Sequence, residues 1–306
     1  MSLTFRQVRH FIATAESGRV SAAAAALNVT QSAVTSSIKA LEAELGRKLF
    51  DRHSNGVTLT FDGHEFLQRA RAIEASVSDA TRGPHRWGIQ VDGTVDVAVS
   101  YTVAGYFLPP LLTRFWRSFP GITVRLHEFQ RDAIEQSLIS GSVDAAIMLI
   151  ANLHDRHSIR SRLLLRSARR LWTCVNHPLL RKDNIKLTDL ASEPYLMLTV
   201  DEAERSAMRY WQHTAHVPNV IFRTLSVEAV RSMVATGMGI TILSDMVYRP
   251  WSLEGHRIEL KTLDDDVHTM DVGLAWKGNA TLSPAARAFC EFVAHSYPGS
   301  EPFKLD

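Results

Sequence analysis

Apolar residues near the N-terminus recur at the three- and four-residue spacing that an α-helix produces. Between residues 4 and 16, this spacing places Phe5, Val8, Phe11, Ile12 and Ala15 on one face. Gly18 follows, and glycine commonly ends a helix because it adopts the left-handed conformation without strain. The pattern therefore predicts a first helix over 4–16 with its apolar face turned inward.

Two further helices are predicted directly after it, joined by a tight turn. The first contains the run Ala22 to Ala26, and we expect Ser21 to cap its N-terminus. Asn28-Val29 should break it, and Thr30 should cap the next helix. In that helix a buried stripe is predicted at Val34, Ile38, Leu41 and Leu45, and Gly46 should end it.

The opposite face of this third helix is polar. It presents Gln31, Ser32, Thr35, Ser36 and Lys39. Short hydrogen-bonding groups and a cation are the side chains that reach base edges and phosphates when a helix lies in a major groove. The pattern therefore predicts a helix that contacts DNA.

A hairpin and a long helix should follow. Residues 50–60 predict two short strands with Asn55-Gly56 as the tight turn, and Thr60 should cap a helix over 61–81. Its apolar residues alternate at spacings of four and three, at Phe66, Ala70, Ile73, Val77 and Ala80. Such a seam needs a partner, which is either a second copy of the helix or the body of its own chain. Gly83-Pro84 should end the helix.

From Gly93 onward the pattern changes to alternating strands and helices. Strands are predicted over 94–100, 123–128 and 144–150, with helices over 106–119 and 132–140. A second set has strands over 170–175, 195–198, 219–223 and 240–243, with helices over 204–213 and 227–235. Residues 268–276 should return to the first set before a closing helix over 283–295. This order predicts a parallel α/β unit followed by a second α/β unit.

Charge is distributed unevenly along the 306 residues, although the net charge is only +2. Residues 1–60 hold seven Lys or Arg against four Asp or Glu, a net of +3. Residues 91–306 hold 23 against 24, a net of −1. A basic module on a near-neutral body indicates one end that binds nucleic acid, with salt-dependent affinity.

Other features narrow the class of protein. Cys174 and Cys290 are the only cysteines, and we expect two buried, reduced thiols because they are far apart in apolar surroundings. No apolar run approaches the ~20 residues of a membrane span, and the N-terminus lacks the apolar core of a signal peptide. We therefore expect a soluble, cytoplasmic protein. No nucleophile–base pair, metal-ligand set or phosphate loop stands out, so we predict no catalytic residues, no metal and no cofactor.

The N-terminal stretch resembles the winged helix-turn-helix of LysR-type transcriptional regulators. The shared residues are Phe5, Phe11, Ala22-Ala23, Leu27, Thr30 to Val34, Ile38, Leu41-Glu42, Leu45-Gly46, Leu49-Phe50, Arg52, Leu59-Thr60 and Gly63. The resemblance implies that Gln31, Ser32 and Thr35 read bases beside Thr30. It also implies that Ser36, Lys39 and Arg52 hold phosphates, and that the seam of the long helix pairs two subunits.

The C-terminal half resembles the effector-binding domain of the same regulators, which is similar to type II periplasmic solute-binding proteins. Supporting pieces are Phe107 to Leu112, Phe119 to Ile122, Gly141 to Ile147, His177-Pro178 and Gly237 to Ile240. The expected fold is thus an α+β winged helix-turn-helix domain (1–60, helix-turn-helix 19–39), then a linker and dimerisation helix with a hinge (61–90). An α/β effector-binding domain (91–306) follows, with subdomain I over 91–160 and 268–306 and subdomain II over 161–267.

Ligands of open α/β sheets bind beyond the carboxyl ends of the strands, near helix N-termini. Reading the strand ends from the sequence gives the expected effector-binding residues Ser100, Tyr101, Thr102, Phe129, Gln130, Thr199 and Ser226. Amides and hydroxyls suit a small anion such as a carboxylate. Each hydroxyl is also a candidate helix cap, which is a purely structural role.

Together these features predict a LysR-type, sequence-specific DNA-binding regulator whose activity a small-molecule effector modulates. The expected partners are double-stranded DNA with an interrupted dyad, an effector of the carboxylate class, and further copies of the chain in a homodimer or homotetramer. RNA polymerase is a candidate partner, and no membrane is expected. The alternative is a solute-binding module, or an enzyme, that carries a vestigial DNA-binding end.

Overall fold

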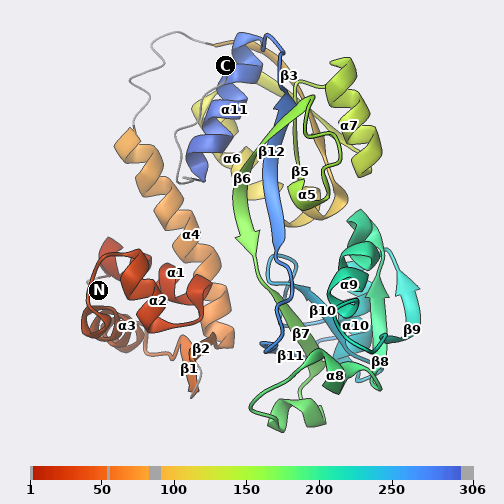
Figure 1. Ribbon diagram of the computed structural model, residues 1–306. Helices are drawn as coiled ribbons and strands as arrows, with labels where there is room; N and C mark the ends of the chain where they lie inside the picture. Colours follow the sequence, from red (N-terminus) through yellow and green to blue (C-terminus); the bar gives the residue numbers. More distant parts are fainter. Residues whose placement is uncertain (1–2, 54–55, 83–90, 298–306) are drawn as a thin grey trace. The chain divides into compact units, whose positions relative to one another are not determined.

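The two patterns in the sequence correspond to two structural units, Met1–Gly88 and Ile89–Asp306. The computed structural model describes residues 3–53, 56–82 and 91–297 of them (Figure 1). The N-terminal unit contains α1 (Phe5–Ser17), α2 (Val20–Ala26), α3 (Gln31–Leu45), β1 (Phe50–His53), β2 (Gly56–Leu59) and α4 (Phe61–Arg82).

The first helix begins and ends as its sequence predicts. The Thr4 hydroxyl accepts the Gln7 amide at 3.3 Å, and the Gln7 side chain accepts the Thr4 amide at 2.7 Å, which completes a capping box. Gly18 ends α1 in the left-handed conformation, with φ of 66°. One expectation is wrong, because Phe5 is 37% exposed and lies outside the core.

The second helix begins two residues earlier than predicted. Arg19 occupies the N-cap position, and Ser21 lies inside α2, so it is not the cap. Two alanines, Ala23 and Ala24, are buried there, and their small side chains allow α1 and α3 to pack close to α2. The core of the unit is completed by aromatic contacts of Phe11 with Phe50 and Phe66, at ring-centroid distances of 5.1 and 5.0 Å.

The first subdomain of the second unit is built on a five-stranded sheet with the order β4-β3-β5-β12-β6. Its strands are β3 (Gly93–Val99), β4 (Ile122–Glu128), β5 (Ala145–Leu149), β6 (Ile159–Ser167) and β12 (Met270–Lys277). The strands β3, β4 and β5 are parallel, as expected, whereas β12 is antiparallel to both of its neighbours. The predicted return of the chain to the first subdomain is therefore confirmed.

Helices cover both faces of this sheet (Figure 1). Alternate residues of β3, Val95, Val97 and Val99, join the core beneath α6 (Leu108–Ser118) and α11 (Pro284–Ser296). Ala98 faces the other way and packs with Ile134 and Leu138 of α7 (Arg131–Ser140). Both faces of the central strands are thus apolar, which explains their near-continuous hydrophobic sequence.

The helix predicted over 106–119 is in fact two helices, α5 (Tyr101–Tyr106) and α6, with Phe107 between them. Pro109 and Pro110 stand in the first turn of α6. Proline is tolerated there but cannot continue a preceding helix, so the chain must start a new one.

The second subdomain contains β7 (Arg169–Cys174), β8 (Pro194–Leu198), β9 (Asn219–Thr224), β10 (Thr241–Ser244) and β11 (Ile258–Lys261), with the helices α8 (Leu187–Leu190), α9 (Ala203–Trp211) and α10 (Val227–Ala235). Its sheet has the order β10-β7-β11, and a bridge from Ile240 to Tyr195 joins it to the parallel pair β8-β9. Short 3-10 turns are η2 (Ile150–Asn152), η3 (Pro178–Arg181) and η4 (Val200–Glu202).

Two expectations about this subdomain are corrected. It begins after β6 rather than at 161, because β6 pairs with β12 along Ile159–Ser167 in the first sheet. The strand β11 was not predicted, since only four residues of it pair with β7. The two crossings between subdomains therefore lie at Ala168 and in residues 262–269.

Candidate functional site

The third helix is fixed at both ends by the residues that the sequence singled out. The Thr30 hydroxyl accepts the Ala33 amide at 3.2 Å and lies 3.0 Å from the Ser32 hydroxyl. Gly46 closes the helix with φ of 65°. The predicted N-cap and C-cap of α3 are confirmed.

Along α3, apolar and polar residues separate as predicted. Val34, Ile38 and Leu41 are at most 1% exposed, and Leu45 packs half-buried against them. Gln31, Ser32, Ser36 and Lys39 are exposed, and Thr35 is half-buried. Because the apolar stripe is fixed in the core, α3 holds these polar side chains outward as one surface, which we call the α3 polar face.

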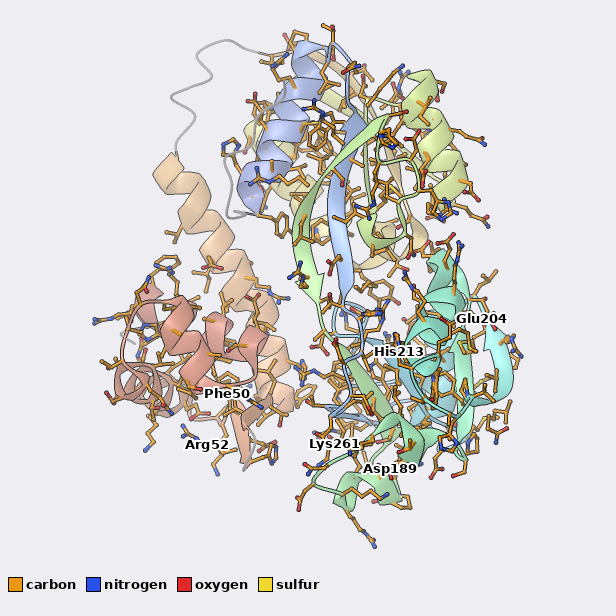
Figure 2. All side chains as sticks on the ribbon, viewed as in Figure 1. Phe50, Arg52, Asp189, Glu204, His213 and Lys261 are labelled. Carbon is orange, nitrogen blue, oxygen red and sulfur yellow. The ribbon has the colours of Figure 1, made fainter. Side chains whose placement is uncertain are left out.

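The predicted hairpin is present, with Phe50 paired to Leu59 and His53 paired to Gly56. Phe50 is buried against the helices, whereas Arg52 is exposed (Figure 2). Gly56 is the first residue of β2 rather than part of the turn, and Asn55 lies outside the described residues. A Cβ atom on Gly56 would lie 2.4 Å from the Gly18 carbonyl oxygen, so only glycine allows the hairpin to approach the end of α1 this closely.

Glu42 has a role that its sequence position did not reveal. Its carboxylate accepts the amides of Leu49 and Phe50, at 2.8 and 3.2 Å. These bonds tie the start of the hairpin to the C-terminal half of α3 across seven and eight residues. The available signal was an acidic residue beside the buried Leu41, one turn before the helix ends. Glu42 thereby positions Arg52 relative to the α3 polar face.

The seam of α4 begins inside its own chain. Ala70 is fully buried, and Phe66 and Ile73 pack half-buried against the same core as α1 and α3. An ion pair of 3.0 Å from Arg71 to Glu16 also joins α4 to α1. The expectation that the whole seam faces a second subunit is therefore corrected for Ala70, while Phe66 and Ile73 pack only in part on the core of their own chain. Val77 is half-buried, whereas the side chain of Ala80, together with Gly83-Pro84, lies outside the described residues.

In the second unit, the three effector-binding residues predicted after β3 differ in exposure and in hydrogen bonding. Ser100 is 5% exposed, and its hydroxyl has no hydrogen-bond partner among the described residues. The Thr102 amide donates to Asp201 at 2.7 Å, so this amide is already occupied by a carboxylate of the other subdomain. Tyr101 is 42% exposed.

The remaining predicted ligand residues are partly used for structure. The Thr199 hydroxyl donates to the Thr224 carbonyl at 3.1 Å, and the Ser226 hydroxyl caps α10 by accepting the Ala229 amide at 3.1 Å. Phe129 stacks on His127 with a ring-centroid distance of 5.9 Å, and Gln130 is exposed at the start of α7. Two of the predicted hydroxyls, those of Thr199 and Ser226, are therefore already engaged in hydrogen bonds within their own subdomain.

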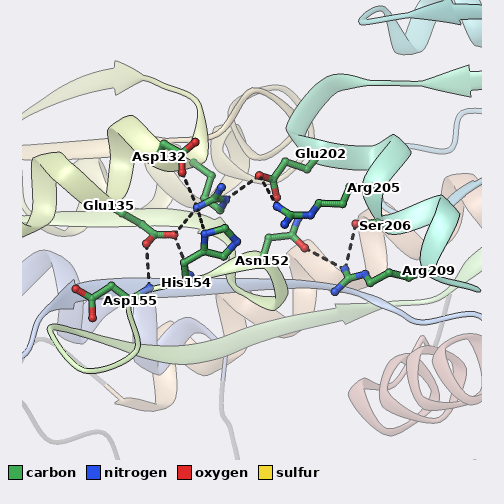
Figure 3. Close-up of polar contacts among 10 residues, drawn as sticks. Asp132, Glu135, Asn152, His154, Asp155, Glu202, Arg205, Ser206 and Arg209 are labelled. Atoms are coloured by element: carbon green, nitrogen blue, oxygen red, sulfur yellow. Dashed lines mark hydrogen bonds and ion pairs between the residues drawn. The ribbon is translucent and has the colours of Figure 1, made fainter.

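Asp201 and Glu202 form a contact between the two subdomains. Both have positive φ, 50° and 60°, a conformation that costs energy for residues other than glycine. Glu202 accepts from Arg131 at 2.8 Å, and Arg131 also donates to Glu135 at 3.1 Å (Figure 3). We call Asp201, Glu202 and Arg131 the cross-subdomain contact.

Glu135 anchors the first-subdomain side of this contact. It is 6% exposed and accepts the amides of His154 and Asp155, each at 3.0 Å. Burial raises the pKa of Glu135, but these two amides and Arg131 outweigh it and hold the pKa below its usual value. Glu135 is therefore a buried carboxylate that stays ionised and orients Arg131 toward Glu202.

A pocket of about 580 Å3 beside α5 is lined by two glutamates and two arginines. The Tyr106 hydroxyl donates to Glu228 at 2.9 Å, and Arg231 donates to the same carboxylate at 2.6 and 2.7 Å. Arg249 lies over the Tyr106 ring, 5.4 Å from its centroid. Among the described residues, Arg249 donates only to the carbonyl oxygens of Met246 and Tyr248, which do not neutralise it. The two arginines of this lining are, however, balanced in number by Glu128 and Glu228.

The described residues form neither a cluster of metal-ligating side chains nor a disulfide. No group of three His, Cys, Asp or Glu side chains there is arranged to hold a metal ion. Cys290 is buried and free, whereas Cys174 is free but only half-buried, which corrects the expectation of two buried thiols. No helix within the described ranges combines the length and apolar character that crossing a bilayer requires.

The sequence matches two family models that together cover most of the chain. The model of the LysR substrate binding domain matches residues 89–297, and that of bacterial regulatory helix-turn-helix proteins of the lysR family matches residues 5–64. The chain is 30% identical to the RuBisCO operon transcriptional regulator of Allochromatium vinosum, with 96% of each chain covered.

Solved structures agree with these matches. HinK, a LysR family transcriptional regulator from Pseudomonas aeruginosa, is similar at a TM-score of 0.61 and 25% identity, covering 95% of this chain and 97% of that one. Full-length CbnR in complex with its target DNA has the same fold, with a TM-score of 0.55 at 24% identity and coverage of 96% and 100%. The chain therefore belongs to the LysR family and is a DNA-binding transcriptional regulator with an N-terminal helix-turn-helix domain and a two-subdomain α/β effector-binding domain.

Proposed function

We propose that this regulator reads its operator through the α3 polar face and that a small-molecule effector bound in the C-terminal domain controls its activity. The observation that carries the proposal is the exposure of Gln31, Ser32, Ser36 and Lys39 above a fully buried stripe. A helix held in this way can enter a major groove without rearranging the core.

Within this face the side chains divide by chemistry. The amide of Gln31 and the hydroxyls of Ser32 and Thr35 suit base edges, which offer donors and acceptors in the major groove. Ser36, Lys39 and Arg52 suit phosphates, since two are cations and Arg52 extends the contact onto the hairpin. Thr30 already caps α3, so its part is to fix the first turn.

Two copies of the chain would present two such helices to an interrupted dyad, with half-sites separated by one or more turns of ~34 Å. We propose a homodimer or homotetramer in which two copies of α4 pair along the part of the helix that follows Ile73, since Phe66, Ala70 and Ile73 pack on the core of their own chain. RNA polymerase is a further proposed partner, and the cytoplasm is the proposed location. Substituting Val77 with lysine should weaken the dimer, which sedimentation velocity measures as a concentration-dependent loss of the larger species.

For the effector we propose a site in the second unit that touches both subdomains, because a ligand bound there biases the angle between them. Two observations support this placement. Ser100 is a buried hydroxyl without a partner among the described residues, and Asp201 already links the subdomains through the Thr102 amide. An effector that alters this contact would change the arrangement of the DNA-binding units.

The test of DNA binding uses the full chain and the DNA upstream of its own coding region. Fluorescence anisotropy at several salt concentrations should show binding that weakens steeply with salt. Lys39→Ala should weaken binding to all sequences and reduce the salt slope by about one per recognition helix. The control Arg117→Ala removes the same charge from an exposed site in the second unit and should leave the slope unchanged. Equal effects of the two variants, or no salt-sensitive binding, would refute the proposal.

A further inference from the structure

A second pocket in the C-terminal unit, of about 470 Å3, lies between the two subdomains. Asn152 and Leu149 line it from the first subdomain, and Ser206 and Arg209 of α9 line it from the second. Arg169 and Met270 line it where the chain crosses between subdomains. Its volume falls in the range of small-molecule sites in proteins. We call it the arginine pocket.

Arg169 contributes a charge that neutral groups hold in place. One of its terminal nitrogens, Nη1, donates to the carbonyl oxygens of His268 and Thr269, the second at 3.0 Å. Carbonyl groups orient a guanidinium but do not neutralise it. No carboxylate forms an ion pair with Arg169 among residues 3–53, 56–82 and 91–297. Its remaining N–H groups make no hydrogen bond with another described residue.

Arg209 is held in a similar way. Its Nη2 donates to Asn152 at 3.1 Å, across the subdomain boundary, and to Ser206 at 3.3 Å. Figure 3 shows Arg209 extending from α9 beside these two residues. Within the described ranges Arg209 also lacks an acidic partner. Burial lowers the pKa of Arg169, and the positive charge of Arg209 lowers it further, so the two cations are close enough to repel one another.

The carboxylates in the lining relieve this repulsion only in part. The nearby charge of Asp271 raises the pKa of Arg169, but burial and Arg209 keep that pKa below its usual value. Asp271 pairs with Arg166 at 3.5 Å and accepts the Thr269 hydroxyl at 2.7 Å. Asp266 lines the pocket but is exposed to solvent, where its charge is screened. Two neighbouring guanidiniums with unused donors, facing a pocket, are the arrangement that binds a planar or tetrahedral oxyanion with charge-assisted hydrogen bonds.

We propose that the arginine pocket is the effector site, and that the effector is a small organic anion whose carboxylate or phosphate group binds Arg169 and Arg209. This inference rests on the proposed function in so far as an effector binds between the subdomains. Leu149, Val267 and Met270 offer apolar surface to the body of the ligand. The oxyanion binds here rather than at the Thr102 amide, because Asp201 already occupies that amide.

The experiment measures thermal unfolding and calorimetric binding of the full chain. The probes are cyclohexanecarboxylate, its neutral amide and inorganic phosphate, each titrated at constant ionic strength. We expect saturable stabilisation by at least one anion and none by the amide, and the stronger anion identifies the preferred group. Arg209→Gln should weaken binding of that anion roughly 10- to 100-fold. Arg117→Gln, which removes an exposed charge elsewhere, should bind it normally.

A second variant keeps the test valid if Arg209→Gln fails to fold. Ala151 is an exposed lining residue, and Ala151→Asp would place a carboxylate beside the arginines. It should raise stability without ligand and abolish the response to anions, whereas the matched control Ala151→Asn should do neither. Absence of anion-specific stabilisation, or an unchanged response in both Arg209→Gln and Ala151→Asp, would overturn the proposal. DNA binding of the unmodified chain is measured separately. If the chain binds DNA but no anion, the proposal for the arginine pocket has failed; if it binds the anion but not DNA, the proposed function has failed.

Discussion

The carboxylate of Asp201 lies 2.7 Å from the backbone nitrogen of Thr102, although 99 residues separate them in the chain. Asp201 belongs to the second subdomain and Thr102 to the first, at the position where the sequence predicted an anionic ligand. The protein thus supplies its own carboxylate to this amide. The same turn supplies Glu202 to Arg131 at 2.8 Å, so two acidic neighbours hold the subdomains together.

Replacing Asp201 tests this contact. Asp201→Ala should lower the free energy of unfolding of the C-terminal unit by about 1–2 kcal/mol, because the Thr102 amide loses an ionised acceptor. Asp201→Asn is the matched control, since asparagine tolerates the left-handed backbone and still offers an oxygen. Hydrogen exchange of the Thr102 amide should be fastest in the alanine variant. Equal protection in all three proteins would contradict the assigned contact.

Glu42 should be required for the geometry of the hairpin. In Glu42→Ala, the amides of Leu49 and Phe50 lose their acceptor in a partly buried site, at a cost of about 1–3 kcal/mol. We expect faster hydrogen exchange at these two amides and weaker DNA binding, because Arg52 is no longer held beside α3. Glu42→Gln should show a smaller change. The prediction fails if exchange at Leu49 and Phe50 is the same in all variants.

The contribution of Glu135 to stability should depend on pH. Its folded-state pKa lies below the ordinary value of 4.5, so the native protein favours the ionised form more than the unfolded chain does. This contribution is fully present above 4.5 and is lost as the pH falls through the lowered folded-state pKa. Urea unfolding should therefore show a difference in the free energy of unfolding between the wild type and Glu135→Gln that shrinks as the pH falls below 4.5.

Asp132 provides the control for that measurement. Asp132 forms an ion pair of 2.7 Å with Arg131, the arginine that also contacts Glu135, but the Asp132 side chain is 76% exposed. Exposed ion pairs contribute little, so Asp132→Asn should change stability by less than about 0.5 kcal/mol. A pH dependence of equal size in the two variants would show that Glu135 has no special role.

Cys290 should be unreactive in the folded protein. Burial raises the pKa of its thiol to about 12, so almost no thiolate exists near neutral pH. A disulfide reagent such as dithiobis(nitrobenzoate) at pH 8 should label Cys174 first, and Cys290 only after unfolding. Rapid labelling of native Cys174→Ser protein would show that Cys290 is accessible.

Sequence patterns predicted α3 closely because its caps and its stripe are local. Thr30, Gly46 and the residues between them lie within one helix, so spacing alone places Gln31 and Lys39 outward. The exposed position of Arg52 could be predicted because Arg52 lies in the hairpin that directly follows α3. The seam of α4 was harder, because spacing reveals that Ala70 needs a partner but not that α1 of the same chain supplies it.

The ligand site depended on contacts between distant residues, which spacing does not report. Ser226 and Thr199 were correctly recognised as hydroxyls near helix starts. In the structure both hydroxyls form hydrogen bonds with backbone groups, Ser226 with the Ala229 amide and Thr199 with the Thr224 carbonyl. Arg169 and Arg209 lie 40 positions apart in the chain, on β7 and α9, and only the fold brings them to one pocket. The strand β6 was not recognised because Leu163, Leu164 and Leu165 follow one another without alternation.

A base-substitution series on the operator tests whether α3 reads bases through its polar face. Each base pair is changed in turn, and binding is measured for the wild type and for Gln31→Ala. We expect the variant to lose about 1–3 kcal/mol per half-site on the native operator and to become indifferent to one symmetrically placed base pair in each half-site. If Gln31→Ala keeps the affinity and the full base preference of the wild type, the account of DNA recognition is contradicted.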